Sequence, residues 1–157
     1  MTREIEGTLV AAKGARFAVV VAKWNALVTD RLAESAVRTL RRCGAAEDAV
    51  DLVRVPGSFE LGVVAEAAAA GGEYAAVICL GAVIQGDTEH DRYINSAVAS
   101  GLMSAGQRSG VPVTFGVLTC GTLEQALNRA GGKVGNKGEE AALAALETLS
   151  VLSQLKA

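Results

Sequence analysis

A chain of 157 residues is long enough for one domain with a buried core, and half of it is apolar although only 4% is aromatic. The formal net charge is −2 and basic residues are scattered among acidic ones, which excludes the basic surface that nucleic acid or an anionic membrane needs. The mean hydropathy of +0.31 is high for a protein of this size, so extensive subunit interfaces are expected.

Strand and helix patterns alternate along the chain. In chain order they predict a strand at 17–22, a helix at 27–43, a strand at 50–55, a helix at 59–70, a strand at 75–80, a helix at about 92–109, a strand at 113–117, and helices at 122–129 and 138–154. Apolar strands in this order require a parallel sheet with helices on both faces, a three-layer α/β/α sandwich. No repeat or linker divides the chain, so a single domain over residues 1–157 is expected.

Residues 1–15 stand outside this alternation and form an N-terminal arm. Their apolar residues Ile5, Leu9 and Val10 could form an extra strand, and the edge of a neighbouring subunit's sheet is a suitable place for it. The arm begins with charged residues and lacks the apolar segment of a signal peptide.

The cysteines indicate the compartment. There are three, without a CxxC pair and with only one histidine in the chain, so no zinc site is predicted. An odd number without a signal peptide favours reduced thiols in the cytoplasm. Cys79 lies in an apolar run and is expected in the core. No stretch reaches membrane-spanning length, because Glu66 and Glu73 interrupt the longest candidate.

The segments that follow the strands carry the candidate site, because ligands of an open parallel sheet bind outside the carboxyl ends of its strands. These segments contain the only tryptophan, Trp24, and the only histidine, His90. The Trp24 ring suits stacking on a flat heteroaromatic ligand, although packing against a helix or a subunit is an alternative. Histidine suits proton transfer near neutral pH, and a solvent-exposed loop histidine is the alternative interpretation of His90.

Two segments could bind an anion. Gly86-Asp87-Thr88 precedes a predicted helix, whose N-terminus attracts phosphate, although Asp87 and Thr88 also suit turn and cap positions. Arg129 and Lys137 bracket a glycine-rich turn, and a guanidinium suits phosphate, although Asn136 as a helix N-cap already explains the turn. Glu60 either favours the dipole of the helix that it begins or accepts hydrogen bonds from a polyhydroxy ligand.

Five segments of the chain resemble the signature segments of the 6,7-dimethyl-8-ribityllumazine synthase family. They read VPGSFEL from residue 55, GAVIQGDTEH from 81, FGVLT from 115, EQALNRAG from 124 and GNKG from 135. The similarity runs in order from about Phe17 to Leu152, and five motifs together are highly specific.

The resemblance implies a flavodoxin-like fold and a transferase of riboflavin biosynthesis. Its reaction would condense 5-amino-6-(D-ribitylamino)uracil with 3,4-dihydroxy-2-butanone 4-phosphate, giving 6,7-dimethyl-8-ribityllumazine, phosphate and water. It implies neither a metal nor a redox cofactor, and small-molecule substrates as the partners.

The resemblance also implies roles for individual residues in binding the aminouracil. Trp24 would stack on the pyrimidine ring, and Phe115 would close over it. The ring edge and the ribityl chain would be held by backbone and carboxylate groups of Ser58, Phe59, Glu60, Ala82, Val83 and Ile84.

The same resemblance implies where the phosphate substrate and the protons are handled. Asp87, Thr88 and Arg129 would bind the phosphate, His90 would transfer protons, and Lys137 would help to position substrate. The family's site lies between neighbouring subunits of a pentamer, so Phe115 and Arg129 are expected from the adjacent chain. The short turn at 131–138 resembles that of members that form sixty-subunit icosahedral shells.

Four positions depart from the family's usual residues. Trp24 stands where the family usually has Phe, and Asp91 where an aromatic residue is usual; Glu89 and Cys120 also differ. Two other functions on the same fold stay open, a protein that stores or senses flavin without catalysis and a cage-forming shell with a vestigial site. The presence of His90, Thr88 and Arg129 argues against both, because storage alone needs no proton transfer.

Overall fold

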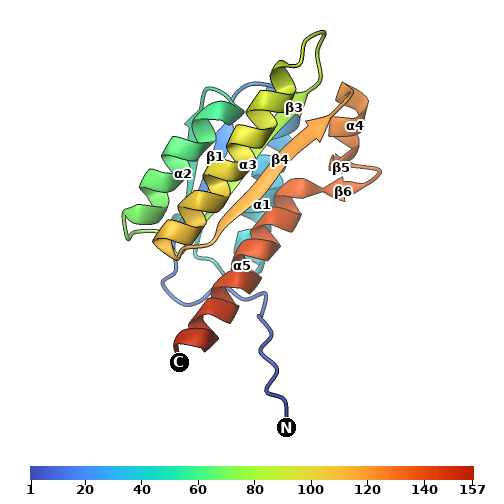
Figure 1. Ribbon diagram of the computed structural model, residues 1–157. Coiled ribbons are helices and arrows are strands. Elements are labelled where there is room, and N and C mark those ends of the chain that lie inside the picture. Colours follow the sequence, from blue (N-terminus) through green and yellow to red (C-terminus); the bar gives the residue numbers. More distant parts are fainter.

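The computed structural model describes residues 1–157 and shows a four-stranded parallel sheet between two layers of helices (Figure 1). The strands are β1 (Phe17–Ala22), β2 (Val50–Val55), β3 (Ala76–Ile84) and β4 (Val113–Cys120). Their order in the sheet is β2-β1-β3-β4, and all neighbours are parallel. The predicted flavodoxin-like α/β/α sandwich is therefore confirmed.

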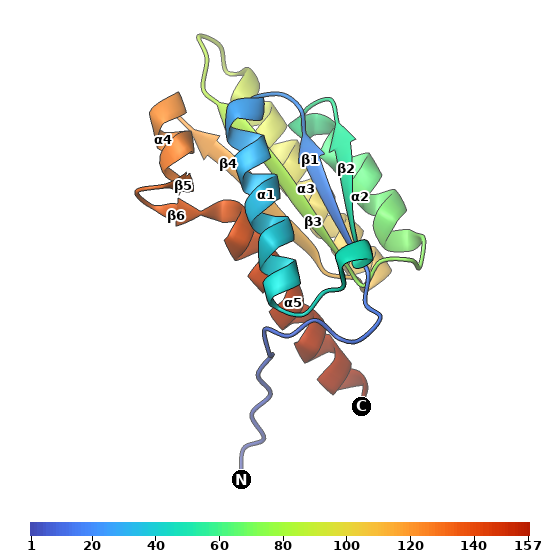
Figure 2. The ribbon, with the colours of Figure 1, turned by 180° about the vertical axis from the view of Figure 1, so that it is seen from behind.

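The helices cover both faces of the sheet. α1 (Ala26–Arg42) and α5 (Lys137–Lys156) lie side by side on one face, which Figure 2 shows from the front. α2 (Leu61–Ala70) and α3 (His90–Ser109) lie on the other face. Shorter elements are the 3₁₀ turns η1 (Glu47–Ala49) and η2 (Ser58–Glu60), the helix α4 (Leu123–Asn128) and a hairpin of β5 (Ala130–Gly132) and β6 (Gly135–Asn136). None of the helices combines the length and apolar composition that crossing a bilayer requires.

The core consists of two apolar layers, one on each face of the sheet. Every residue of β1 is buried, because this strand lies between β2 and β3 and helices cover both of its faces. Successive β1 side chains alternate between the two layers, as the pleat of a strand requires. Cys79 lies in the layer beneath α2 and α3, and its burial raises the pKa of the thiol to about 12. Its prediction as a core residue is confirmed.

Two strands and two helices are longer than predicted, among them α5, which extends to Lys156. β3 and β4 pair as far as Ile84 and Cys120, so the segments 81–84 and 118–120 are strand and not loop. Each of the two strands continues beyond its apolar residues because the other provides backbone hydrogen-bonding partners there. α3 begins at His90, which is therefore the first residue of a helix and not a loop residue. The glycine-rich turn contains the β5–β6 hairpin, with Gly131 and Gly135 at positive φ.

The N-terminal arm has no strand within this chain and runs along α5. The backbone N–H of Thr8 donates to the Ser150 hydroxyl at 3.1 Å, and the Gln154 amide donates to the Glu6 carbonyl at 2.8 Å. Both chain termini consequently lie at one end of the molecule, opposite the carboxyl ends of the strands (Figure 1).

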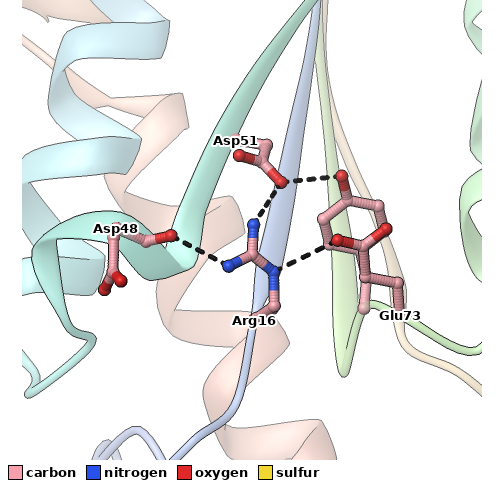
Figure 3. A network of polar contacts seen from close by, with 5 residues as sticks. Arg16, Asp48, Asp51 and Glu73 are labelled. Carbon is pink, nitrogen blue, oxygen red and sulfur yellow. Dashed lines mark hydrogen bonds and ion pairs between the residues drawn. The ribbon is translucent and has the colours of Figure 1, made fainter.

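A polar network closes the amino end of the sheet (Figure 3). Arg16 binds the Asp51 carboxylate at 2.7 Å, donates to the Asp48 carbonyl at 3.0 Å and lies 3.4 Å from Glu73. The Tyr74 hydroxyl donates to the same Asp51 oxygen at 2.8 Å. Hydrogen bonds from Tyr74 and Arg16 lower the pKa of the Asp51 carboxyl, and the bond to Asp51, with burial, raises the pKa of the Tyr74 phenol. The network therefore joins the segments that precede β1 and β3 to the start of β2.

Candidate active site

A cavity of about 390 Å³ opens at the carboxyl end of the sheet, within the size range of small-molecule sites. Its walls come from the segments that follow β1 and β2, from the end of β3 and from the start of α3. The lining residues are Trp24, Asn25, Gly57, Ser58, Phe59, Glu60, Ala82, Val83, Ile84, Gly86, Thr88, His90, Asp91 and Ile94. Most of the residues predicted for the site therefore surround one cavity.

Trp24 forms one wall and is not a core residue, because 75% of it is exposed. The loop that carries it is bound to the neighbouring strand segments on both sides. The Lys23 N–H donates to the Val55 carbonyl at 2.8 Å, and the Trp24 N–H donates to the Pro56 carbonyl at 3.1 Å. On the other side, the Asn25 amide donates to the Ala82 carbonyl at 2.8 Å. The exposed ring thus stands on a well-anchored backbone.

The second wall is η2, which packs directly on β3. Gly81 permits this approach, because Ser58 occupies the space that a β-carbon at position 81 would need. One oxygen of the Glu60 carboxylate accepts from the Gly57 N–H at 3.0 Å, so Glu60 caps its own turn. Its other oxygen has no partner in the chain and remains able to accept from a ligand.

The end of β3 forms the floor and offers unpaired backbone groups. β3 pairs with β4 as far as Ile84, whereas its pairing with β1 ends at Leu80. On the side of β3 that faces β1, the backbone groups of Ala82 and Ile84 are therefore without a strand partner, whereas those of Val83 point toward β4. Apart from the Ala82 carbonyl, which Asn25 binds, the groups without a strand partner can hydrogen-bond to the edge of a planar ligand, as a sheet edge does.

His90 lies at the mouth of the cavity on the first turn of α3, and its side chain is exposed. The imidazole makes no hydrogen bond within the chain, so both ring nitrogens are available. The Thr88 hydroxyl accepts from the His90 backbone N–H at 3.4 Å, at the start of α3. Asp87 is exposed and does not line the cavity. Asp91 and Ile94, which the sequence did not indicate as site residues, do line it.

Besides Asp87, three predicted residues lie away from this cavity. Phe115 is 40% exposed on β4 and lines a groove beside α3 and α5 instead. Arg129 and Lys137 lie near the β5–β6 hairpin, and both approach Glu140, at 4.0 Å and 3.2 Å. The side chain of Asn136 accepts from the N–H groups of residues 138 and 139, which confirms it as the N-cap of α5.

Sequence reasoning missed Asn25 as a site residue. It is the only residue other than glycine with positive φ, at φ 62° and ψ 47°. Asparagine tolerates this left-handed conformation better than most residues, which is the only signal that the sequence offers. No group of three or more His, Cys, Asp or Glu side chains comes together to hold a metal ion.

Comparison with known proteins identifies the family. The family model of 6,7-dimethyl-8-ribityllumazine synthase matches residues 14–153. The chain belongs to the 6,7-dimethyl-8-ribityllumazine synthase family. Every residue predicted for the site falls inside the matched region. The chain is therefore an enzyme of riboflavin biosynthesis, a transferase, as the sequence motifs predicted.

Individual relatives of the lumazine synthase family support the assignment over nearly the whole chain. A protein of Halorhodospira halophila named 6,7-dimethyl-8-ribityllumazine synthase is 52% identical over 97% of this chain and 97% of its own length. One of Desulfatibacillum aliphaticivorans with the same name is 44% identical over 99% of this chain and 100% of its own. A chloroplastic synthase of Spinacia oleracea is 54% identical over 95% of this chain, which spans 67% of that longer protein.

Proposed function

We propose that the cavity beside Trp24 and His90 is the active site for condensing 5-amino-6-(D-ribitylamino)uracil with 3,4-dihydroxy-2-butanone 4-phosphate. The product is 6,7-dimethyl-8-ribityllumazine, with release of phosphate and water. One observation carries the proposal: an exposed flat ring, an unpaired strand edge and an imidazole without a partner line the same cavity. These are the groups that a planar heterocycle with a reacting amine requires.

The aminouracil occupies the inner part of the cavity. Its pyrimidine ring stacks on Trp24, and its polar edge bonds to backbone groups of Ala82 and Ile84, with Val83 lining the cavity between them. The ribityl hydroxyls lie along η2, where Ser58, Phe59 and the second oxygen of Glu60 receive them. Glu60 suits this role because its first oxygen is already held by Gly57, which fixes the orientation of the carboxylate.

The phosphate of the second substrate requires a positive charge that this cavity lacks. None of its lining residues is Lys or Arg, and Thr88 with the N-terminus of α3 offers only weak attraction. We propose that Arg129 of an adjacent subunit supplies the charge, while the backbone N–H groups of Asp87 and Thr88 and the Thr88 hydroxyl bind the phosphate at the start of α3. Lys137 positions substrate from the same neighbour. A guanidinium binds a phosphate in a bidentate manner and stabilises it as it leaves.

His90 moves protons during the condensation. The aminouracil amine attacks the ketone, and loss of water from the adduct forms an imine, steps that need a base and then an acid near neutral pH. Loss of phosphate, followed by attack of the second amine on the remaining carbonyl with loss of a second water, closes the ring and completes the product. An imidazole free of other hydrogen bonds can serve both directions of transfer. The scheme uses neither a metal nor a redox cofactor.

The site is complete only in an assembly, which we propose to be a pentamer built from this single domain. Phe115 lies on the exposed side of β4, where it can close over the pyrimidine ring bound to a neighbouring subunit. The arm formed by residues 1–15 adds a strand to the exposed edge of a neighbour's β2, where Leu52 is 45% exposed. The short β5–β6 hairpin favours assembly of pentamers into a sixty-subunit shell.

A reducing compartment suits the chain, because Cys43, Cys79 and Cys120 are all free. We propose the cytoplasm. Some of the plant relatives are named chloroplastic, so a plastid is the compartment to compare.

The decisive experiment mixes the purified protein with both substrates and follows the absorbance of the lumazine and the release of phosphate. Formation of both at equal rates supports the enzyme. Binding of the product without turnover would instead indicate a flavin-binding protein, the alternative that keeps the fold and the aromatic wall.

A further inference from the structure

Asn25 adopts a conformation that its position in the helix does not require. It is the N-cap of α1, yet its side chain makes no capping hydrogen bond, although asparagine is among the best capping residues. Its backbone is left-handed, at φ 62°, which disfavours most side chains. Its carbonyl accepts from Val28 and Thr29, so helix formation uses only the backbone of this residue. The Asn25 side chain instead hydrogen-bonds to a residue outside α1.

That side chain extends the sheet where its backbone pairing stops. The ladder between β1 and β3 ends at Val21 and Leu80, and the Asn25 amide then donates to the Ala82 carbonyl at 2.8 Å. The bond is partly buried and crosses the cavity wall from the segment after β1 to the floor formed by β3. Opposite it, the Trp24 N–H is held by Pro56. The backbone at Trp24 is thus held by hydrogen bonds on both sides, to Pro56 and, through Asn25, to Ala82.

We propose that Asn25 is a positioning residue that holds the Trp24 ring at a fixed distance from the ring-edge groups of β3. The proposal rests on the function proposed above for Trp24. Asparagine combines two properties that this task needs, tolerance of the left-handed backbone and an amide that donates to a carbonyl. Glycine would keep the backbone without the bond, and aspartate would place a carboxylate against the Ala82 oxygen.

The test uses Asn25→Gly and Asn25→Asp in the full chain. Trp24 is the only tryptophan, so the anisotropy of its emission without ligand reports how firmly the ring is held. Both variants should lower the anisotropy and raise the KM for the aminouracil about tenfold, with kcat within about twofold and an unchanged KM for the butanone phosphate. Val37→Ala, about three turns further along α1, controls for a general loss of stability and should change neither quantity.

A double substitution decides whether Asn25 acts through Trp24. In a Trp24→Ala background, Asn25→Gly should raise the KM for the aminouracil no further, because the ring that it positions is gone. An additive effect would overturn the proposal and indicate that the Asn25 amide contacts substrate itself. Unchanged anisotropy in both Asn25 variants would also overturn it.

The function proposed for Trp24 is tested independently of the role of Asn25. An unchanged KM for the aminouracil in the single variant Trp24→Ala would contradict it. In that case a reduced anisotropy in Asn25→Gly would still show that Asn25 fixes the loop. The loop would not contribute to substrate binding, however, and the proposed positioning role of Asn25 would be wrong.

Discussion

Ser58 and Gly81 lie so close together that a β-carbon at position 81 would clash with the Ser58 hydroxyl oxygen. Gly81→Ala should therefore push η2 away from β3 and open the cavity. We expect the KM for the aminouracil to rise about tenfold and stability to fall by about 1–3 kcal/mol, the usual effect of overpacking. Steady-state kinetics and urea unfolding measure the two effects.

Gly62→Ala is the matched control for this substitution. A β-carbon at position 62 on α2 meets no atom within 4 Å, so the alanine should fit. It should leave the kinetics unchanged and stabilise α2 by about 0.5–1 kcal/mol. Equal kinetics for both alanine variants would show that the contact between Ser58 and Gly81 does not shape the site.

His90→Ala should leave the fold nearly intact, because the side chain is exposed and makes no hydrogen bond within the chain. Turnover should fall by about 10²-fold or more, which is typical of a lost general acid or base. Rapid-mixing measurement of lumazine formation tests this, with circular dichroism to verify folding. Wild-type turnover in a folded variant would remove His90 from the mechanism.

If each active site is shared between two subunits, mixing two inactive variants should restore part of the activity. His90→Ala and Arg129→Ala should each be nearly inactive alone. When the two chains are co-expressed in equal amounts, random pairing should give about a quarter of the interfaces a wild-type His90 and a wild-type Arg129. Activity near that fraction supports the adjacent-chain site, and activity no higher than that of the separate variants contradicts it.

Trp24 emission should be quenched by riboflavin and by the product lumazine, because each flat ring would stack on the indole. The quenching should saturate at one ligand per subunit. Trp24→Ala should weaken binding by about 1–3 kcal/mol, the range for a large aromatic contact at a binding site. A titration without quenching, in a preparation shown to be active, would leave Phe115 as the stacking ring.

The Arg16 network predicts a pH dependence of stability at both extremes. The pKa of Asp51 is lowered in the folded protein, so its contribution is present above the unfolded value near 3.9 and is lost as the pH falls through the folded value. The pKa of Tyr74 is raised, so its contribution is present below the unfolded value near 10 and is lost as the pH rises through the folded value.

Urea midpoints measured from pH 2 to pH 11 test this prediction. Asp51→Asn should lower the midpoint at pH 7, with a difference from wild type that shrinks in acid. Tyr74→Phe should remove part of the alkaline loss. Asp48→Asn is the control, because Asp48 contributes only its carbonyl to the network. Parallel pH profiles for wild type and Asp51→Asn would contradict the assignment.

The fold was predictable because its strands are short segments rich in apolar residues. The central strand β1 is wholly apolar and has the predicted bounds, and the edge strand β2, with the sequence VDLVRV, ends as predicted before Pro56-Gly57. The ends of β3 and β4 were missed because Gly81 and Thr119 read as loop residues, and only their mutual pairing makes them strand. His90 was taken for a loop residue because the helical pattern is clear only from Arg92 onward.

The candidate site was predictable in part. The rule that ligands bind at the carboxyl ends of parallel strands correctly indicated that Trp24 and the segment after β2 lie at one cavity. Asn25 could not be found in this way, because its interaction depends on a left-handed backbone and on the position of a distant carbonyl. Arg129 lies outside the cavity of its own chain, and no pattern within one chain reports the geometry between subunits.

The two chain ends leave the domain together, joined by the bond between Gln154 and Glu6, at the end of the sheet away from the cavity. A protein or peptide fused to the C-terminus would therefore extend away from the substrate entrance. Such a fusion should display the attached protein while lumazine formation continues. The enzyme's own turnover would then report whether the fused subunits still assemble correctly.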